Sequence, residues 1–389
     1  MKNILYISYD GITDPLGQSQ VLPYIINLSK EDYKFHLISF EKPDRYIKYN
    51  SSIEKICFEN NIEWHPIKYT KTPPFFSTIF DLFKMKKLAK ELNNKHNFSL
   101  VHCRSYISSL VGLSFKRLYR IPFLFDMRGF WADERVEGKL WNLKNPIYKL
   151  VYRYFKKKEK QFLLESNHII SLTHNGKKNI IKLPCFHHLE NNISVIPCCT
   201  DLSLFKPVKR DSNSFIIGYL GSLGTWYLVR EMLVFFQKVK EKIPNAKFHV
   251  LTKDDSGIIF THCKKLGIDS ENIHVEESDR EDIPFKTRNW NFSLCFIMPT
   301  FSKIFSSPTK QGELMGMGIP IICNSGVGDV DFIVEKYKSG FILNDINKVN
   351  LDNIFNTNFV KQILYEGAKD YFSLNKGVKS YNKIYEKIC

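Results

Sequence analysis

The sequence has no run of about 20 consecutive apolar residues, which is the length that a membrane-spanning helix requires. Its N-terminal segment, MKNILYISYD, also lacks the long apolar region and the small-residue cleavage site of a secretory signal peptide. The nine cysteines form no C-x-x-C pair, so their spacing supports neither a zinc site nor a disulfide framework. We therefore expect a cytoplasmic protein with reduced thiols.

The glycine pattern of dinucleotide-binding sites is missing as well. The segment 9–20, YDGITDPLGQSQ, joins a first strand to a first helix and does not contain G-x-G-x-x-G. This argues against an enzyme that uses NAD or FAD. Gly11 and Gly17 allow tight turns in this segment.

Positive charge is abundant and unevenly distributed. Residues 1–205 contain 31 lysines and arginines against 19 aspartates and glutamates, a net charge of +12, whereas the remaining residues carry +4. A basic N-terminal half indicates contact with a polyanion or an anionic lipid surface, and ordinary solubility charge is the alternative. We expect no nucleic-acid partner, because the second half is nearly neutral and contains no recognition motif.

Strand-like and helix-like segments alternate along the chain, which is typical of βαβ units and parallel sheets. The alternation breaks at 197–214, where proline and polar residues indicate a linker. We expect an α/β protein with two doubly wound, Rossmann-like domains facing a cleft, over 1–205 and 206–365, with a final helix at about 366–389 crossing back. The expected strands are 3–9, 33–40, 99–106, 122–127, 168–173, 193–197, 215–220, 246–251, 292–298 and 319–323.

The segment 302–318, SKIFSSPTKQGELMGMG, follows an apolar strand and leads into a helix. Ser306 or Ser307 is placed to cap that helix, and the proline that follows suits its first position. The free amides of Thr309 and Lys310 would then point outward at the positive end of the helix dipole. This pattern predicts an anion site for a phosphate or diphosphate.

Charged side chains accompany this helix start. Lys303 and Lys310 add two cations, and Glu313 can accept hydrogen bonds from sugar hydroxyls. The alternative is a capped helix with solvated lysines and a capping-box glutamate. A second loop, 221–227 (GSLGTWY), offers Gly221 for close backbone approach to a ligand, although a plain turn fits it equally well.

Polar residues also follow two expected strands of the first domain. His102 lies near the end of the strand 99–106, and the segment 126–135, DMRGFWADER, follows the next strand. Arg128 and Asp133 in this segment are costly to order for packing alone, so we expect the loop to bind a ligand. A salt-bridge network between domains is the alternative.

Longer motifs resemble a known family. Residues 196–207, IPCCTDLSLFKP, are similar to the inter-domain segment IPNGVD…F.P of retaining glycosyltransferases of family 4. Residues 313–320, ELMGMGIP, resemble that family's EAMACGLP helix. FDMRGFWADE, GYLGSLGTWY and SSPTKQGE resemble a subset from bacterial surface-polysaccharide clusters. The resemblance covers nearly the whole chain and implies the GT-B fold.

The resemblance further implies a nucleotide-sugar donor on the C-terminal domain, an acceptor on the N-terminal domain, retention at the anomeric carbon, and no obligatory metal or cofactor. Glu313 matches the second glutamate of a paired motif, which holds the ribose, while a phenylalanine stands where the first would be. The family's arginine and lysine after the first strand of the second domain are absent, and Ser222 and Tyr227 fall at their places. Lys303 and Lys310 are the expected replacements.

The remaining expected roles concern orientation and binding. His102, Arg128 and Asp133 would orient the donor sugar or the acceptor hydroxyl. The other residues that we expect to contact the donor are Gly17, Gly221, Ser222, Ser307 and Thr309.

Two segments combine apolar residues with lysine: 71–90, KTPPFFSTIFDLFKMKKLAK, and 146–160, PIYKLVYRYFKKKEK. Such basic amphipathic helices can lie on anionic bilayers, and core-facing helices with solvated lysines are the alternative. With the basic first half, they favour a peripheral membrane protein with a lipid-linked saccharide acceptor. A sugar-nucleotide epimerase of the same fold and a non-catalytic transferase partner stay open as other functions.

Overall fold

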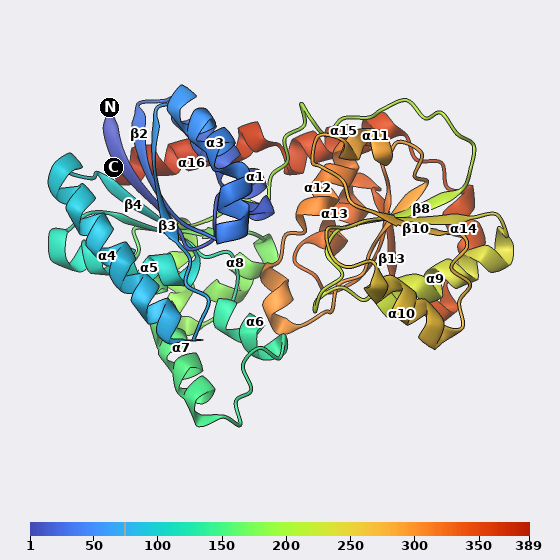
Figure 1. Cartoon of the computed structure of the whole chain (residues 1–389), viewed down its shortest axis with the longest axis horizontal. Coiled ribbons are helices and arrows are strands. Elements are labelled where there is room, and N and C mark those ends of the chain that lie inside the picture. Colours follow the sequence, from blue (N-terminus) through green and yellow to red (C-terminus); the bar gives the residue numbers. More distant parts are fainter. Residues whose placement is uncertain (74) are drawn as a thin grey trace. The chain divides into compact units, whose positions relative to one another are not determined.

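In the computed structural model the chain forms two compact units, and many of their helices and strands are labelled in Figure 1. The structure describes residues 1–73 and 75–389, so Pro74 of the expected membrane-facing segment lies outside the described residues. The bounds of the units differ slightly from the expected boundaries at 205 and 365. The first unit consists of Met1–Pro197 and Leu374–Cys389, and the second consists of Cys198–Ser373.

A parallel sheet with the strand order β3-β2-β1-β4-β5-β6-β7 forms the centre of the first unit. Its inner strands are nearly continuous apolar runs, because helices cover both faces of such a sheet. Ile4, Phe35 and Val101 are accordingly fully buried. The elements are β1 (Lys2–Ser8), α1 (Pro15–Gln20), α2 (Leu22–Leu28), β2 (Tyr33–Glu41), α3 (Pro43–Glu59), β3 (Ile62–Lys68), α4 (Phe76–His96), β4 (Leu100–Arg104), α5 (Ser105–Tyr119), β5 (Phe123–Asp126), α6 (Trp131–Glu137), α7 (Pro146–Glu165), β6 (His168–Ser171), α8 (His174–Ile181), η1 (Pro184–Asn192), β7 (Ile193–Val195) and α16 (Leu374–Ile388).

The second unit has a parallel sheet with the order β10-β9-β8-β11-β12-β13. Phe235, Phe236 and Phe248 belong to the apolar cluster between this sheet and its helices. The elements are β8 (Ile216–Leu220), α9 (Val229–Lys242), β9 (Lys247–Leu251), α10 (Gly257–Leu266), β10 (Ile273–Glu276), α11 (Ile283–Lys286), β11 (Phe292–Cys295), η2 (Phe301–Phe305), α12 (Thr309–Gly316), β12 (Ile321–Asn324), α13 (Val330–Tyr337), β13 (Gly340–Leu343), η3 (Ile346–Lys348), α14 (Leu351–Asn356) and α15 (Lys361–Tyr371).

Two doubly wound α/β sheets were expected, and this fold class is confirmed. The sequence did not predict the edge strands β3, β10 and β13. Edge strands are half-exposed and tolerate charge and proline, so they lack the apolar pattern of inner strands. In β3, Pro66 and Lys68 are exposed, whereas Ile62 is buried.

The C-terminal helical stretch is divided between the units. We expected one helix over about 359–388, but α15 ends at Tyr371 and α16 begins at Leu374. Between them, Thr200 N donates to Phe372 O at 2.7 Å and holds the chain where it leaves the second unit. The helix α16 packs on α2 in the first unit and buries Tyr381 and Tyr385.

Neither unit offers a helix, within the described ranges 1–73 and 75–389, with the length and hydropathy needed to cross a bilayer. Every cysteine is a free thiol, and Cys185 is exposed.

Candidate functional site

The second sheet reverses its strand order beside β8, which lies between β9 and β11. Ligands of open α/β sheets bind outside the carboxyl ends of the strands at such a point. The segments that follow β8, β9, β10 and β11 all leave from this edge, because the strands are parallel. The candidate site of the second unit is therefore built from these segments and from α12.

A buried carboxylate holds two cations in this region. Glu313 of α12 is fully buried; its Oε1 accepts a hydrogen bond from Arg280 Nη1 at 2.7 Å, and its Oε2 accepts one from Lys310 Nζ at 2.7 Å. The Arg280 guanidinium also lies 4.6 Å from the centroid of the Phe205 ring. Both oxygens of Glu313 are thus bonded to cations, so it anchors Arg280 and Lys310 and is not the open acceptor for sugar hydroxyls that we expected.

Lys303 connects two of the expected loops. It lies in η2 and is buried, and its Nζ is 3.8 Å from the centroid of the Trp226 ring, which belongs to the GSLGTWY loop. Its carbonyl oxygen accepts a hydrogen bond from Gly328 N at 2.9 Å. The ammonium group therefore stabilises the packing of Trp226 through a cation–π contact.

The start of α12 differs from the expected cap. The helix begins at Thr309 without a side-chain cap, and Pro308 occupies the capping position instead of the first helical position. Ser307 Oγ accepts a hydrogen bond from Cys198 N at 3.1 Å, so it holds the inter-unit segment and does not cap the helix. Thr309 and Lys310 are half-buried, so the helix start is not sealed. The first amides of a helix have no partner within it and can bind an anion.

The loop after β8 is fixed by the segment after β9. Gly221 has a φ of +156°, which favours glycine, and Tyr219 Oη donates to the carbonyl oxygen of Ser222. Ser222 Oγ and Leu223 N donate to Asp254 Oδ2 at 2.5 and 2.6 Å. Asp254 also lines a pocket of about 410 Å³, whose other lining residues are Thr252, Lys253, Asp255, Ser256, Val275, Glu276 and Glu277.

The first unit presents a cluster of charges where its own strand order reverses, between β1 and β4. Arg104 ends β4 and is paired in register with Asp126, which ends β5. Arg104 is buried; its Nη1 lies 3.8 Å from Asp126 Oδ2, and its Nε lies 3.8 Å from Asp10 Oδ2. Arg128 Nη1 lies 3.6 Å from Asp126 Oδ1. Two guanidinium groups therefore surround one buried carboxylate.

Electrostatics keeps this carboxylate charged. Burial raises the pKa of Asp126, but Arg128, His102 and Arg104 together outweigh burial and hold the pKa below its ordinary value. Arg128 and Ser105, the residue that follows Arg104, both have positive φ, 59° and 65° respectively. Such strained non-glycine residues cluster at functional sites, so this edge of the first sheet is a candidate for ligand binding.

His102 does not reach this edge as a free side chain. It is buried, its Nδ1 is 2.6 Å from Tyr385 Oη, and its Nε2 is 3.8 Å from Asp126 Oδ2. Burial lowers the pKa of His102 more than Asp126 raises it, so the ring is neutral at pH 7. The prediction that His102 orients a substrate is not supported, because the ring is packed between Tyr6 and Tyr381.

Asp133 belongs to a separate network between α6 and α7. Tyr152 Oη donates to its Oδ1 at 2.7 Å, and Lys156 Nζ donates to its Oδ2 at 2.7 Å. Lys156 also donates to Glu159 at 2.6 Å, and Tyr106 donates to the other oxygen of Glu159. Asp133 therefore holds α6 and α7 together, and the substrate contact expected of it stays a prediction.

Gly17 has a packing role in the first loop. It is buried, and a Cβ at this position would lie 2.2 Å from Gly11 O. Glu41, at the end of β2, accepts hydrogen bonds from Ile12 N at 2.8 Å and Thr13 N at 3.1 Å. Its missing side chain therefore allows α1 to pack on the loop, and the ligand contact expected of Gly17 stays a prediction.

Sequence reasoning missed Arg280, Asp254 and Glu41. Arg280 follows the unpredicted strand β10, so nothing in the sequence indicated that it lies near Glu313. Glu41 and Asp254 each follow an expected strand, and a carboxylate at the end of an apolar strand is the signal that could have identified them.

Known proteins resemble this chain in sequence and in fold. The family model described as Glycosyltransferase Family 4 matches residues 23–204. No curated protein matches the chain. The structure of sucrose-phosphate synthase from Thermosynechococcus elongatus is 14% identical, has a TM-score of 0.73, and the alignment covers 100% of this chain and 99% of that chain.

Two further structures were determined with nucleotide ligands. The structure of HepE from Anabaena in complex with UDP and glucose is 13% identical, with a TM-score of 0.67 and coverage of 99% of this chain and 100% of that chain. UDP-GlcNAc 2-epimerase from Neisseria meningitidis bound to UDP-GlcNAc is 11% identical, with a TM-score of 0.58 and coverage of 100% of both chains. At these identities the likeness establishes the fold, which is the GT-B type that the sequence resemblance implied.

Proposed function

We propose that this chain is a glycosyltransferase that moves a sugar from a nucleotide-sugar donor to an acceptor. The observation that carries the proposal is the pair of cations, Arg280 and Lys310, held by the buried carboxylate of Glu313 beside the start of α12. Cations and helix amides at the carboxyl edge of a doubly wound sheet are suited to a diphosphate. The match of residues 23–204 to a glycosyltransferase family model agrees with this function.

The proposed chemistry is stabilisation of the leaving group. Negative charge grows on the diphosphate as the bond to the sugar breaks, and preoriented donors accelerate that step when they bind the growing charge best. One such donor lowers the activation barrier by roughly 3–4 kcal/mol. We assign this role to Lys310 and to Arg280, and not to the expected Lys303, because Lys303 lies against Trp226.

The pocket lined by Asp254 is the proposed site of the nucleoside, since carboxylates there can accept hydrogen bonds from ribose hydroxyls. For the acceptor we propose the edge of the first sheet that carries Arg104, Asp126 and Arg128. Retention at the anomeric carbon, independence of a metal, and a lipid-linked saccharide acceptor in surface-polysaccharide biosynthesis are the finer parts of the proposal, and they rest on the motifs shared with family 4.

Donor binding is expected to raise the melting temperature of the protein. A ligand that binds only the folded chain stabilises it by about 2.7 kcal/mol at 100 times its Kd. A thermal-shift screen of nucleotide sugars with different bases should therefore identify one donor class. The shift should be lost in Lys310→Ala and Glu313→Ala. It should be kept in Lys264→Ala, which changes an exposed lysine of α10.

The product of the reaction separates transfer from epimerisation, which the epimerase with the same fold suggests as the second candidate. A transferase releases a nucleoside diphosphate in proportion to the acceptor glycosylated. An epimerase yields an isomer of the nucleotide sugar without any acceptor, and that outcome would exclude transfer. No turnover of either kind with a donor that binds would instead indicate a non-catalytic partner.

A surface of the first unit fits an anionic bilayer, and we propose that the protein works at the inner face of the cell membrane. On α4, Phe76 and Phe83 are 67% and 69% exposed, and on α7, Leu150 is 70% exposed. The helix α5 packs against both α4 and α7. Exposed lysines accompany these apolar side chains, among them Lys86 and Lys157.

Two residues of the expected membrane surface have other roles. Val151 is buried and faces the core, and Lys156 is bonded to Asp133 and Glu159. Burial lowers the pKa of Lys158, and the charges of Arg117 and Lys86 lower it further, which indicates that positive charge from α4 and α7 accumulates on one surface.

Reversing charge on this surface is expected to release the protein from anionic vesicles. Each lysine near such a membrane contributes about 1 kcal/mol, so Lys86→Glu with Lys157→Glu should weaken binding roughly 30-fold or more. The matched control is Lys264→Glu with Lys265→Glu on α10, which should bind like the wild type. Co-sedimentation with vesicles containing phosphatidylserine measures the effect, and equal binding by both double variants would disprove the membrane assignment.

A further inference from the structure

A cluster of potential metal ligands lies in the first unit, on residues that neither candidate site uses. His36 is in β2, Glu63 is paired with it in register on β3, and His96 is the last residue of α4. One ligand atom from each of the three lies within 4.8 Å of the other two. His36 Nδ1 is 3.2 Å and His96 Nε2 is 3.9 Å from Glu63 Oε2. The two separations from Glu63 Oε2 bracket the roughly 3.3–3.6 Å between ligand atoms of a tetrahedral zinc site, in which each ligand atom is about 2.0–2.2 Å from the ion.

The imidazoles of this cluster lack the hydrogen bonds that buried polar groups normally form. His36 is completely buried, and neither of its ring nitrogens has a hydrogen-bond partner in the described part of the chain. Nε2 of His96 and Nε2 of His65 also have no hydrogen-bond partner among the described residues. The His65 ring stacks on the His36 ring with 5.9 Å between the ring centroids. Buried nitrogens without partners are rare and require an explanation.

Neighbouring residues hold the three ligands in place. Glu63 Oε1 accepts a hydrogen bond from Lys34 Nζ at 2.5 Å, which leaves Oε2 directed at the histidines. The backbone carbonyl of His96 accepts a hydrogen bond from Asn3 Nδ2 at 2.7 Å. Bonds of this kind orient the ligands of metal sites. Lys34 also adds positive charge, which Glu63 compensates.

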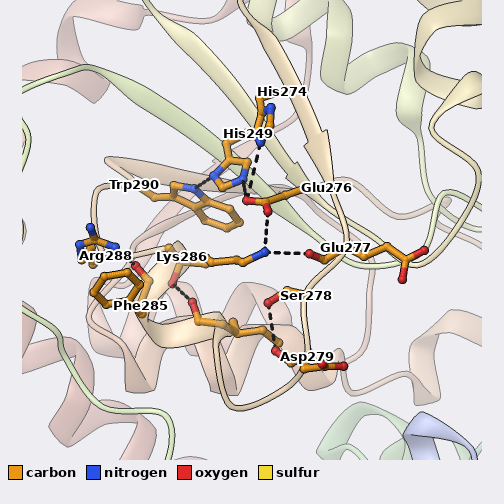
Figure 2. Close-up of polar contacts among 12 residues, drawn as sticks. His249, His274, Glu276, Glu277, Ser278, Asp279, Phe285, Lys286, Arg288 and Trp290 are labelled. Carbon is orange, nitrogen blue, oxygen red and sulfur yellow. Dashed lines mark hydrogen bonds and ion pairs between the residues drawn. The ribbon is translucent and has the colours of Figure 1, made fainter. Parts of the chain in front are cut away.

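A second cluster of similar composition lies in the second unit and provides a contrast. Figure 2 shows His249 and His274 directed toward Glu276, together with Trp290 and Lys286. Trp290 Nε1 donates to His249 Nδ1 at 3.1 Å, so the neutral ring carries its proton on Nε2, which faces Glu276 Oε1 at 2.9 Å. That proton occupies the position of a metal ion, and Lys286 is bonded to the other oxygen of Glu276.

We propose that His36, Glu63 and His96 bind a zinc ion that joins the edge of the first sheet to the end of α4. Two imidazoles and one carboxylate are ligands that Zn²⁺ commonly takes, and no thiolate is needed. The ion would occupy the space beside nitrogens that have no hydrogen-bond partner among the described residues. It would stabilise the edge strand β3, which has a neighbour on one side of the sheet. The site is structural and differs from the metal-free transfer chemistry proposed above.

Zinc titration of chelator-treated protein tests the proposal. The wild type should bind one Zn²⁺ per chain, and its melting temperature should rise by about 5–10 °C when free zinc is 100 times the Kd. Both effects should disappear in His96→Gln and in Glu63→Gln. These positions are partly exposed, so the variants should fold without zinc as the chelated wild type does.

His274→Gln is the matched control, because it removes a histidine from the second cluster. It should retain the zinc and the shift in melting temperature. Cobalt(II) substitution identifies the ligand type, because thiolate ligands from the nine cysteines would add an intense charge-transfer band. Each of four results would overturn the proposal. The wild type binds no zinc, His96→Gln and Glu63→Gln still bind it, His274→Gln loses it, or the cobalt-substituted protein shows a thiolate band.

Discussion

Replacing Glu313 with glutamine is expected to lower the rate of sugar transfer by roughly 10²–10³-fold, as the loss of one preoriented donor typically does. The carboxylate holds Arg280 through one oxygen and Lys310 through the other. A glutamine side chain has the same shape but only one acceptor oxygen, and its amide N–H groups repel the second cation. One of the two cations is then no longer fixed beside the diphosphate. The rate of nucleoside diphosphate release, measured with saturating donor and acceptor, reports the change.

The control for this variant is Glu335→Gln, which changes an exposed glutamate on α13 of the same unit. It should leave both the transfer rate and the donor-induced thermal shift unchanged. Rates are compared per folded molecule, because Glu313 is buried and its replacement also lowers stability. A Glu313→Gln enzyme with a transfer rate within about threefold of the wild type would show that the anchored cations do not act on the leaving group.

Replacing Asp126 with asparagine is expected to lower the free energy of unfolding of the first unit by about 3–5 kcal/mol, the usual cost of removing one partner from a buried ion pair. Arg104 is only 4% exposed, and without the carboxylate Asp10 is its one remaining ion-pair partner among the described residues. Urea unfolding followed by circular dichroism measures the change.

The pH dependence of stability should change in the same variant. The pKa of Asp126 is lower in the folded state, so its stabilising effect is present above the unfolded pKa and is lost as the pH falls through the folded pKa. Asp126→Asn should therefore flatten the acid side of the stability curve. Asp10→Asn is the control, because Asp10 is 55% exposed and also pairs with Arg104; it should cost less than about 1 kcal/mol. Equal effects of the two variants would contradict the role of Asp126.

The two α/β sheets were predictable because each inner strand is a short apolar run between helical segments. Burial on both faces imposes that pattern, as in β1, β5 and β8. The edge strands β3 and β10 were missed because half-exposed strands do not need a continuous apolar run. The consequence was functional as well as structural, since Arg280 follows β10 and could not be placed near Glu313 without that strand.

The sequence motifs identified the residues of the candidate site more reliably than they predicted the role of each residue. Glu313 and Lys310 lie together as the helix segment suggested, but their side chains bond to each other. His102 was expected at a binding edge because it lies near the end of an expected strand, yet Tyr381 and Tyr385 of α16, about 280 residues later in the chain, pack against it and help to bury it. Asp133 is similarly taken up by side chains of α7. Side-chain partners from distant segments depend on tertiary packing, which local sequence patterns do not encode.

The sequence by itself determined the fold class and the approximate positions of the inner strands, because alternating apolar and amphipathic segments have few ways to bury their surfaces. It also determined the glycine at position 17 and the carboxylate at 313 as residues with special roles. Only the tertiary structure decided which side chains meet: Arg280 with Glu313, Arg104 with Asp126, and His36 with Glu63 and His96. A charged or ligating side chain acquires its function from the groups within a few ångströms of it, and in this chain those groups come from other strands and helices.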